Sequence, residues 1–134
     1  MITIYSLLIY LNTMSKYYRL FTSPAGLKVL VGKNSIANDR ITFRLAQKND
    51  LWFHVKNKPG SHVILQSGDF SYQTNEQRIL DIYFSAELAK HFSKAKNDYK
   101  SDVEYCEVKH VFKDLDCDDG EVLTSNTKII SIYK

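Results

Sequence analysis

The sequence predicts an α+β fold, a mostly antiparallel sheet built from hairpins with two helices packed on one face. Three observations lead to this prediction. Short runs rich in β-branched and aromatic residues are joined in pairs by turns that contain Gly or Pro. Residues 75–97 place apolar side chains at intervals of three or four, which is typical of a helix. The resulting order, β-β-α-β-β-α-β-β-β, joins neighbouring strands mainly through hairpins and therefore favours antiparallel pairing.

The first predicted hairpin consists of YYRLFT (17–22) and LKVLVG (27–32). The turn between them contains Pro24, whose ring restricts φ, and Gly26, which adopts a positive φ without a steric penalty. A short helix over 35–47 follows, because its apolar residues lie near helical spacing behind Asn34 or Ser35 as an N-cap. After the long helix, three late strands are predicted at 102–112, 121–125 and 128–133.

Residues 50–56 and 62–67 form the second predicted hairpin, whose Pro-Gly pair suits a type II turn. Alternation along the first strand separates its side chains into a core set, Leu51, Phe53 and Val55, and an opposite set, Trp52, His54 and Lys56. An aromatic ring beside cations suits RNA, because the ring stacks on a base while the cations meet phosphates. The alternative is that Trp52 packs beneath a helix and that His54 is a hydrogen-bonded strand residue.

The register of this hairpin decides whether His54 and His62 lie on one face of the sheet. An even loop would separate them, whereas an odd loop or a bulge would bring them together. With Asp39, the two histidines would offer acid–base chemistry, so an alternative function is a small RNA-modifying or RNA-cleaving enzyme. No metal-ligand or nucleophile motif accompanies them, so the sequence predicts no metal and no cofactor, and it favours binding over catalysis.

The 134-residue chain is long enough for one domain with a hydrophobic core. We expect residues 14–134 to form that domain and residues 1–13 to be an N-terminal extension, because Met14 would serve as a start. The apolar N-terminal stretch is too short to span a bilayer and lacks the features of a secretory signal. The sequence therefore predicts no membrane contact and, with two cysteines outside any C-x-x-C pair, a cytoplasmic protein.

The net charge of +3 is unevenly distributed along the chain. Seven basic residues oppose two acidic ones between Lys28 and Lys58, and Lys94 and Lys96 follow at the end of the predicted long helix. Five carboxylates cluster in residues 114–121. A basic side and an acidic turn indicate an anionic partner that binds in a defined orientation.

Residues 26–65, GLKVLVGKNSIANDRITFRLAQKNDLWFHVKNKPGSHVIL, resemble the signature of the NFACT-R domain. This domain is the C-terminal module of the ribosome-quality-control factor RqcH and of fibronectin-binding-protein-A-like proteins. Residues 85–111 resemble the helix and the V-x-Y-x-x-V-K strand of the same family, so the resemblance covers 17–133. Its most specific runs are NDR at 38–40, DLWFH at 50–54 and PGSH at 59–62.

The resemblance implies an RNA-binding module that acts on tRNA or the large ribosomal subunit in translation quality control. The N-terminal NFACT domain, the helix-hairpin-helix element and the coiled coil of the rescue factor have no counterpart in this sequence. Peptide-tail elongation is therefore not carried over. As a stand-alone domain, the chain is expected to work with the ribosome or with a partner chain that carries the missing NFACT domains.

The resemblance also implies which residues contact RNA. These are Arg40, Trp52, His54, Lys56, Gly60, Ser61, His62, Lys94 and Lys96. The residues expected to orient them or to support the turn are Asn38, Asp39 and Pro59. By their chemistry, the basic side chains would meet phosphates, the rings would stack on or hydrogen-bond to a base or ribose, and the glycine would let the backbone approach the RNA.

One segment departs from the family pattern. DCDDGEV at 116–122 replaces the usual Pro-Gly near the last turn and adds negative charge where a basic or neutral loop is expected. RNA contacts by this loop are therefore not implied. A third possible function is a protein-interaction module whose basic face meets an acidic protein or DNA.

Overall fold

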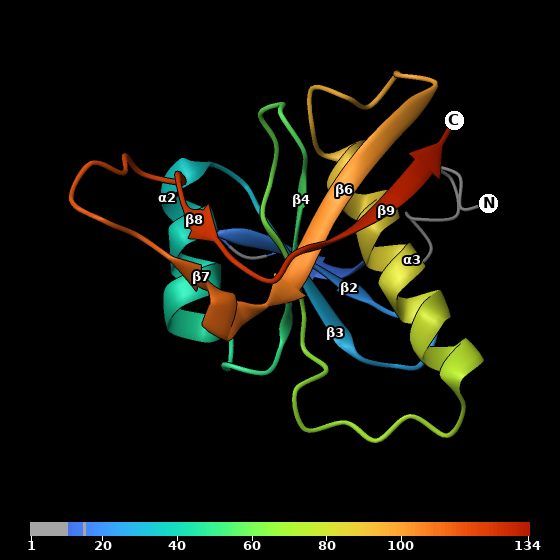
Figure 1. The fold of residues 1–134 in the computed structure, drawn as a ribbon. Coiled ribbons are helices and arrows are strands. Elements are labelled where there is room, and N and C mark those ends of the chain that lie inside the picture. Colours follow the sequence, from blue (N-terminus) through green and yellow to red (C-terminus); the bar gives the residue numbers. More distant parts are fainter. Residues whose placement is uncertain (1–10, 15) are drawn as a thin grey trace.

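A seven-stranded antiparallel sheet is the main element of the computed structural model, which describes residues 11–14 and 16–134 (Figure 1). The strand order is β1-β2-β3-β5-β4-β6-β9, and β7 and β8 form a separate pair. The strands are β1 (Leu11–Met14), β2 (Tyr18–Thr22), β3 (Lys28–Gly32), β4 (Leu51–Val55), β5 (Val63–Leu65), β6 (Lys100–Glu107), β7 (Val111–Phe112), β8 (Leu123–Thr124) and β9 (Lys128–Tyr133).

Helices form where the sequence predicts them. The first is α2 (Ser35–Arg40), which continues into a π-helical turn, η1 (Ile41–Leu45), and the long helix is α3 (Asn75–His91). A 3-10 turn, η2 (Val108–His110), follows β6. The Asn34 side chain accepts a hydrogen bond of 2.8 Å from the Ala37 amide, which confirms it as the N-cap of α2.

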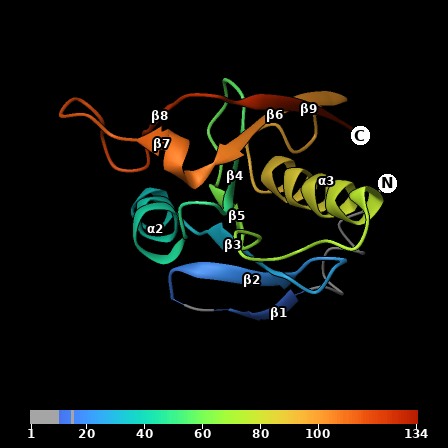
Figure 2. The ribbon, with the colours of Figure 1, turned by 60° about the horizontal axis from the view of Figure 1, so that its bottom comes forward.

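The two helices lie on opposite faces of the sheet (Figure 2). The predicted α+β class is confirmed, but the expectation that both helices pack on one face is wrong. Val29 and Val31 contact the core beneath α3, whereas Leu30, between them in β3, packs with Ile41 of η1 on the other side. Because the central strands carry apolar residues on both faces, each face requires a cover.

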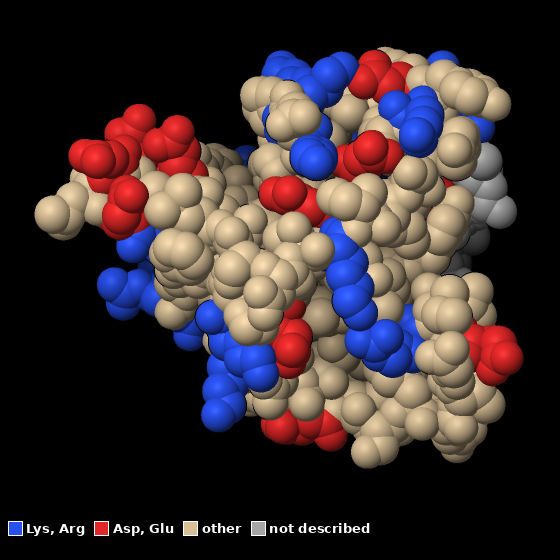
Figure 3. Space-filling view, in the orientation of Figure 1, with Lys and Arg blue, Asp and Glu red and all other residues tan. Residues whose placement is uncertain are grey.

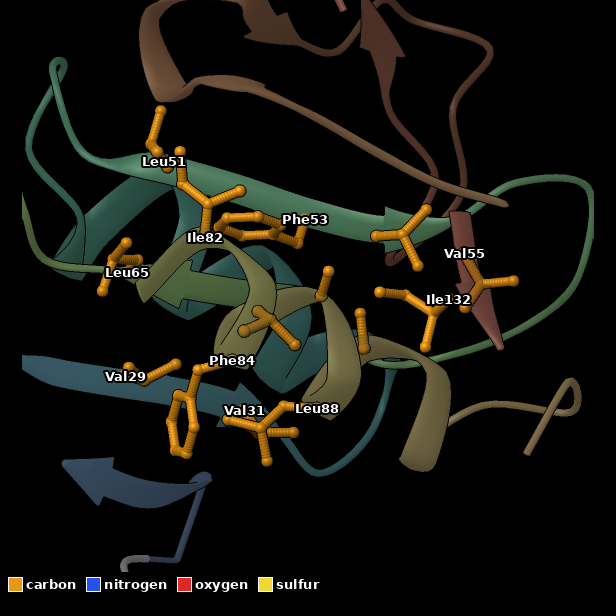
Figure 4. Packing of buried hydrophobic residues seen from close by; sticks show 14 of the residues in the cluster. Val29, Val31, Leu51, Phe53, Val55, Leu65, Ile82, Phe84, Leu88 and Ile132 are labelled. Carbon is orange, nitrogen blue, oxygen red and sulfur yellow. The ribbon is translucent and has the colours of Figure 1, made fainter. Parts of the chain in front are cut away.

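The larger core lies between α3 and the sheet (Figure 4). Phe84 and Leu88 of α3 are fully buried against the strands, together with Phe53 of β4 and Ile132 of β9. Each such side chain contributes about 1.5–3 kcal/mol through burial. This packing holds α3 across the sheet, so that its C-terminal end lies beside the tip of the β4–β5 hairpin.

A buried carboxylate joins α3 to the first hairpin. Asp81, which has no exposed surface, accepts hydrogen bonds from the Ser23 hydroxyl (2.8 Å), the Ala25 amide (3.0 Å) and the Tyr72 hydroxyl (2.8 Å). In the same turn Gly26 has a φ of 91°, which confirms the positive dihedral predicted for it. The network fixes the turn between β2 and β3 against the helix.

The N-terminal boundary differs from the predicted one where the structure describes it. Residues 11–13 belong to β1, which pairs with β2, although they fall within the expected extension. The remainder of that extension, 1–10, lies outside the described residues. Within the described ranges, no helix has the length and apolar character that crossing a bilayer requires.

Candidate nucleic-acid interface

The β4–β5 hairpin brings His54 and His62 onto the same face of the sheet. Phe53 pairs with Val63, so an odd number of residues separates the two paired positions. The two imidazole ring centroids lie 5.7 Å apart at 86°. The register therefore resolves the open alternative in favour of one shared face.

The tip of this hairpin is not the predicted type II turn. The positive φ belongs to Asn57 (64°), not to Gly60. Gly60 instead lies against the chain that follows α3, where an added Cβ would be 2.6 Å from the Ser93 Cβ. Two backbone hydrogen bonds close this contact, from the Ser61 amide to the Phe92 carbonyl (3.0 Å) and from the Lys94 amide to the Pro59 carbonyl (2.9 Å).

The end of β3 and helix α2 contact the same hairpin from the other side. The Ser61 hydroxyl donates to the Gly32 carbonyl (2.6 Å), and the His62 amide donates to the Asn38 side-chain oxygen (3.0 Å). Asn38 is almost fully buried, so its amide group serves as an internal connection. Three segments that are distant in sequence are thereby joined at the hairpin tip.

A groove of about 590 Å³ lies where these segments meet, and we call it the hairpin groove. Its lining includes Asn38, Pro59, Gly60, Ser61 and Lys94, all of which the sequence analysis selected. Two further lining residues, Lys33 and His91, were not selected. No carboxylate lines the groove among the described residues. The hairpin groove thus combines cationic side chains with neutral polar groups, as an anionic ligand requires.

The pKa of His91 in this groove is affected by burial and by the charges around it. Partial burial lowers the pKa below its ordinary value, and the positive charges of Lys96, Arg19 and Lys90 lower it further. A bound phosphate would oppose these effects by favouring the imidazolium form. The groove therefore lies in a positive field that a phosphate group would partly neutralise.

A second cavity, of about 670 Å³, adjoins the hairpin groove and shares Asn38, Pro59 and Gly60 with it. Its opposite wall is the segment between β7 and β8, which we call the acidic loop. The carboxylates of the acidic loop are Asp114, Asp116, Asp118, Asp119 and Glu121. No lysine or arginine lines this second cavity within the described part of the chain. An RNA phosphate is therefore disfavoured there.

The acidic loop is held against α2 by specific contacts. Lys113 donates to an Asp39 carboxylate oxygen (2.8 Å) and to the Asp118 carbonyl (2.8 Å). Gly120, with a φ of 80°, approaches Ser35 so closely that an added Cβ would lie 2.9 Å from the Ser35 Cβ. Asp39 thus anchors the loop through Lys113.

The side chain of His62 is buried between the hairpin, α2 and the acidic loop. Its Nε2–H donates to the Gly120 carbonyl (3.1 Å), and its Nδ1 accepts from the Thr42 hydroxyl (2.9 Å). Burial is the main cause that lowers the pKa of His62 to about 3, with a smaller contribution from His54. Both ring nitrogens are hydrogen-bonded and the ring is only 1% exposed. His62 therefore stabilises the contact between these segments from inside the protein.

Trp52 also lies inside the protein. It is 1% exposed and packs with Leu30 and Ile64, while its ring stacks with His54 at a centroid distance of 5.8 Å and an angle of 10°. With 1% of its surface exposed, the Trp52 ring offers too little area for a base to stack on, so the expected stacking role does not fit this position. Partly buried His54 is the outer member of the stack, and burial lowers its pKa.

The other predicted cations are exposed but do not line the hairpin groove. The Arg40 guanidinium lies over the Tyr17 ring, 4.4 Å from its centroid. Lys56 and Lys96 are exposed beside the hairpin tip and after α3, respectively. The structure therefore separates Lys94, which lines the groove, from three cations around it.

The groups of the enzymatic alternative are engaged elsewhere. One Asp39 oxygen binds Lys113, and both nitrogens of His62 bind groups outside that set. No hydrogen bond joins Asp39 to either histidine among the described residues. The same residues contain no cluster of three or more His, Cys, Asp or Glu that would hold a metal ion.

Figure 3 shows how charge is distributed over one face of the protein. Acidic side chains gather on the projecting loop between β7 and β8, whereas basic and acidic side chains lie side by side over the rest of this face. None of the five carboxylates of the acidic loop lines the hairpin groove. An extended anion would thus bind at the hairpin and avoid the acidic loop.

Comparisons with known proteins identify related domains. Residues 16–126 match the family model of the NFACT protein RNA binding domain. The Rqc2 homolog RqcH of Bacillus subtilis (strain 168) is 40% identical over 93 residues, which cover 69% of this chain and 15% of that protein. The homolog of Streptococcus suis (strain 05ZYH33) is 40% identical over 85 residues, 63% of this chain and 14% of that one.

A solved structure shows the same fold. The C-terminal part of the fibronectin/fibrinogen-binding protein from Streptococcus suis (FBPS) superposes with a TM-score of 0.75 and 33% sequence identity, over 91% of this chain and 47% of that one. The chain spans about one seventh of the length of the two RqcH relatives. Because the family model covers most of the chain, this protein belongs to the family of NFACT-protein RNA-binding domains.

Proposed function

We propose that this domain binds RNA through the hairpin groove, with phosphates held by Lys33 and Lys94. The observation that carries the proposal is a groove lined by cations, with no carboxylate among its described lining residues, where Asn38, Gly60 and Ser61 of the family signature join three segments. Charged hydrogen bonds from lysine to phosphate are about twice as strong as neutral ones. The groove therefore supplies the sequence-independent part of RNA affinity.

Neutral groups in the groove complement the lysines. The Asn34 oxygen is occupied as the cap of α2, so its NH₂ group remains to donate to a phosphate or a ribose hydroxyl. His91 would add a third positive charge only where a bound phosphate offsets the lowering of its pKa. The acidic loop borders the adjoining cavity and repels phosphates, which orients the RNA backbone along the groove.

The relatives support a proposal for the biological setting. RqcH proteins are described as Rqc2 homologs, and this chain corresponds to a small part of them. We propose that it acts in ribosome quality control in the cytoplasm and that its RNA is tRNA or large-subunit ribosomal RNA. The ribosome, or a partner chain with the other NFACT domains, would supply the remaining functions.

Charge removal in the groove is expected to reduce the salt dependence of RNA binding. In a Lys33→Gln/Lys94→Gln variant, the slope of log Kd against log salt should be shallower by about 1.4–1.8, because each lysine no longer releases a counterion. Binding to tRNA should also weaken at low salt. Filter binding across a salt series measures both quantities.

Lys28→Gln is the matched control, because Lys28 is exposed at the start of β3 and lines neither cavity. Its slope should change by less than half of the change in the double variant. If the control and the double variant lose the same slope, RNA binds a diffuse basic surface and the proposed groove is wrong. If wild-type protein binds neither tRNA nor ribosomal RNA at low salt, the RNA-binding proposal itself fails.

A further inference from the structure

A separate cavity of about 340 Å³ lies at the opposite end of β4 from the hairpin tip, and we call it the Tyr105 slot. Tyr105 and Glu107 of β6, Arg78 of α3 and Lys128 of β9 contribute to its lining. The segment before α3 adds Phe70 and Tyr72. The slot has no lining residue in common with the hairpin groove.

Sheet pairing fixes the orientation of Tyr105. It pairs with Phe53 of β4 on one side and with Lys128 of β9 on the other, so the three residues form a row across the sheet. Phe53 stacks on the Tyr105 ring at a centroid distance of 5.3 Å and an angle of 16°. Tyr105 is only partly buried, so part of it remains accessible beside a fixed ring partner.

The charged groups around Tyr105 favour an anion with a planar part. Arg78 and Lys128 are exposed, and neither forms an ion pair with a described residue. The one carboxylate in the lining, Glu107, lies 3.6 Å from Lys109 and is thus partly neutralised. The second aromatic pair, Phe70 and Tyr72, meets edge to face at 4.8 Å.

We propose that the Tyr105 slot binds one unstacked nucleotide of single-stranded RNA, with the base on Tyr105 and a phosphate held by Arg78 and Lys128. The cavity volume falls within the range of small-ligand sites. Aromatic side chains flanked by cations are the usual platform for single-stranded nucleic acid. The inference rests on the proposed RNA-binding function and adds a second contact to it.

α3 contributes a lining residue to each of the two sites. Arg78 is in the first turn of this helix and His91, which lines the hairpin groove, is at its end. Thirteen residues at 1.5 Å each separate them by about 20 Å. A single strand that reaches both sites gains affinity because its second contact is intramolecular.

The test compares Tyr105→Leu with Tyr105→Phe on two probes. These are a mixed-sequence single-stranded RNA of about 12 nucleotides and an abasic ribose-phosphate strand of the same length. Tyr105→Leu should weaken the base-bearing RNA roughly 5- to 150-fold, the range for loss of one stacked base, and leave the abasic strand unchanged. Tyr105→Phe keeps the ring and should bind both probes like wild type.

Equal affinity of wild type and Tyr105→Leu for the base-bearing RNA would overturn the slot, as would equal losses on both probes. In that case, weaker RNA binding by the Lys33→Gln/Lys94→Gln variant would still support the hairpin groove. If the wild-type protein binds no RNA, both proposals fail. If thermal melting shows that the Tyr105→Leu variant is not folded, the Arg78→Gln/Lys128→Gln variant provides the test of the slot instead. This surface variant should weaken RNA binding more than Lys28→Gln, and an equal effect would contradict the slot.

Discussion

Gly32→Ala is expected to destabilise the domain by about 2–5 kcal/mol, because Asn38 leaves no room for a side chain. A Cβ at Gly32 would lie 2.0 Å from the Asn38 side-chain oxygen and 3.1 Å from the Asn38 Cα. That oxygen accepts the hydrogen bond of the buried His62 amide. The new methyl group must displace α2 or rotate Asn38 and leave the amide unsatisfied.

Urea unfolding of wild type, Gly32→Ala, Asn38→Ala and the double variant measures this coupling. Removing the Asn38 side chain takes away the clashing atom, so the double variant should lose less stability than the two single variants together. Strictly additive losses would contradict the close contact between Gly32 and Asn38. The same experiment tests the contact between Gly32 and Asn38 that helps to form the hairpin groove, since Asn38 lines this groove.

Acid is expected to destabilise the domain through His62. Burial lowers its folded pKa to about 3, from an ordinary value of 6.5. Between these values the unfolded chain binds a proton that the folded chain does not, so stability falls as pH falls. The loss is about 1.4 kcal/mol per pH unit, or roughly 2–3 kcal/mol between pH 6.5 and pH 4.5.

His62→Gln separates this effect from other acid-sensitive groups. Glutamine can accept from Thr42 and donate to the Gly120 carbonyl but takes up no proton in this range. The free energy of unfolding should therefore depend less on pH in the variant, by most of the stated slope. Parallel pH profiles for the two proteins would show that His62 does not have a depressed pKa. His54, whose pKa is also lowered, contributes equally to both profiles.

Local signals predicted much of this fold. The Asn34 cap, the positive φ at Gly26 and the helical spacing in α3 depend on neighbours within a few residues, and the structure confirms each. The long helix ends at His91, before the predicted 97, because the following segment instead bonds to the hairpin tip. Such a tertiary contact leaves no periodicity in the sequence.

The placement of the helices was missed for a related reason. Alternation in β4 suggested one core face and one working face, yet Trp52 is as buried as Phe53. The clue was the uninterrupted apolar runs in β3 and β5, which are typical of strands covered on both sides. This pattern indicates that Trp52 belongs to a second core, beneath η1.

The candidate site was recovered in part. The family signature identified Asn38, Gly60 and Ser61, and the basic cluster identified Lys94, all of which line the hairpin groove. Lys33 and His91 join them only through backbone bonds between segments far apart in sequence. The position of the acidic loop likewise depends on the tertiary contacts of Lys113 and Gly120.

The most direct test of the hairpin groove is an NMR titration of the wild-type domain with single-stranded RNA of about 12 nucleotides. RNA phosphates in the groove should shift the backbone amide resonances of Gly60, Ser61, Ser93 and Lys94 and leave those of Asp116 to Asp119 in the acidic loop nearly unchanged. Shifts concentrated on the acidic loop, or saturating binding without shifts at the hairpin tip, would contradict the account.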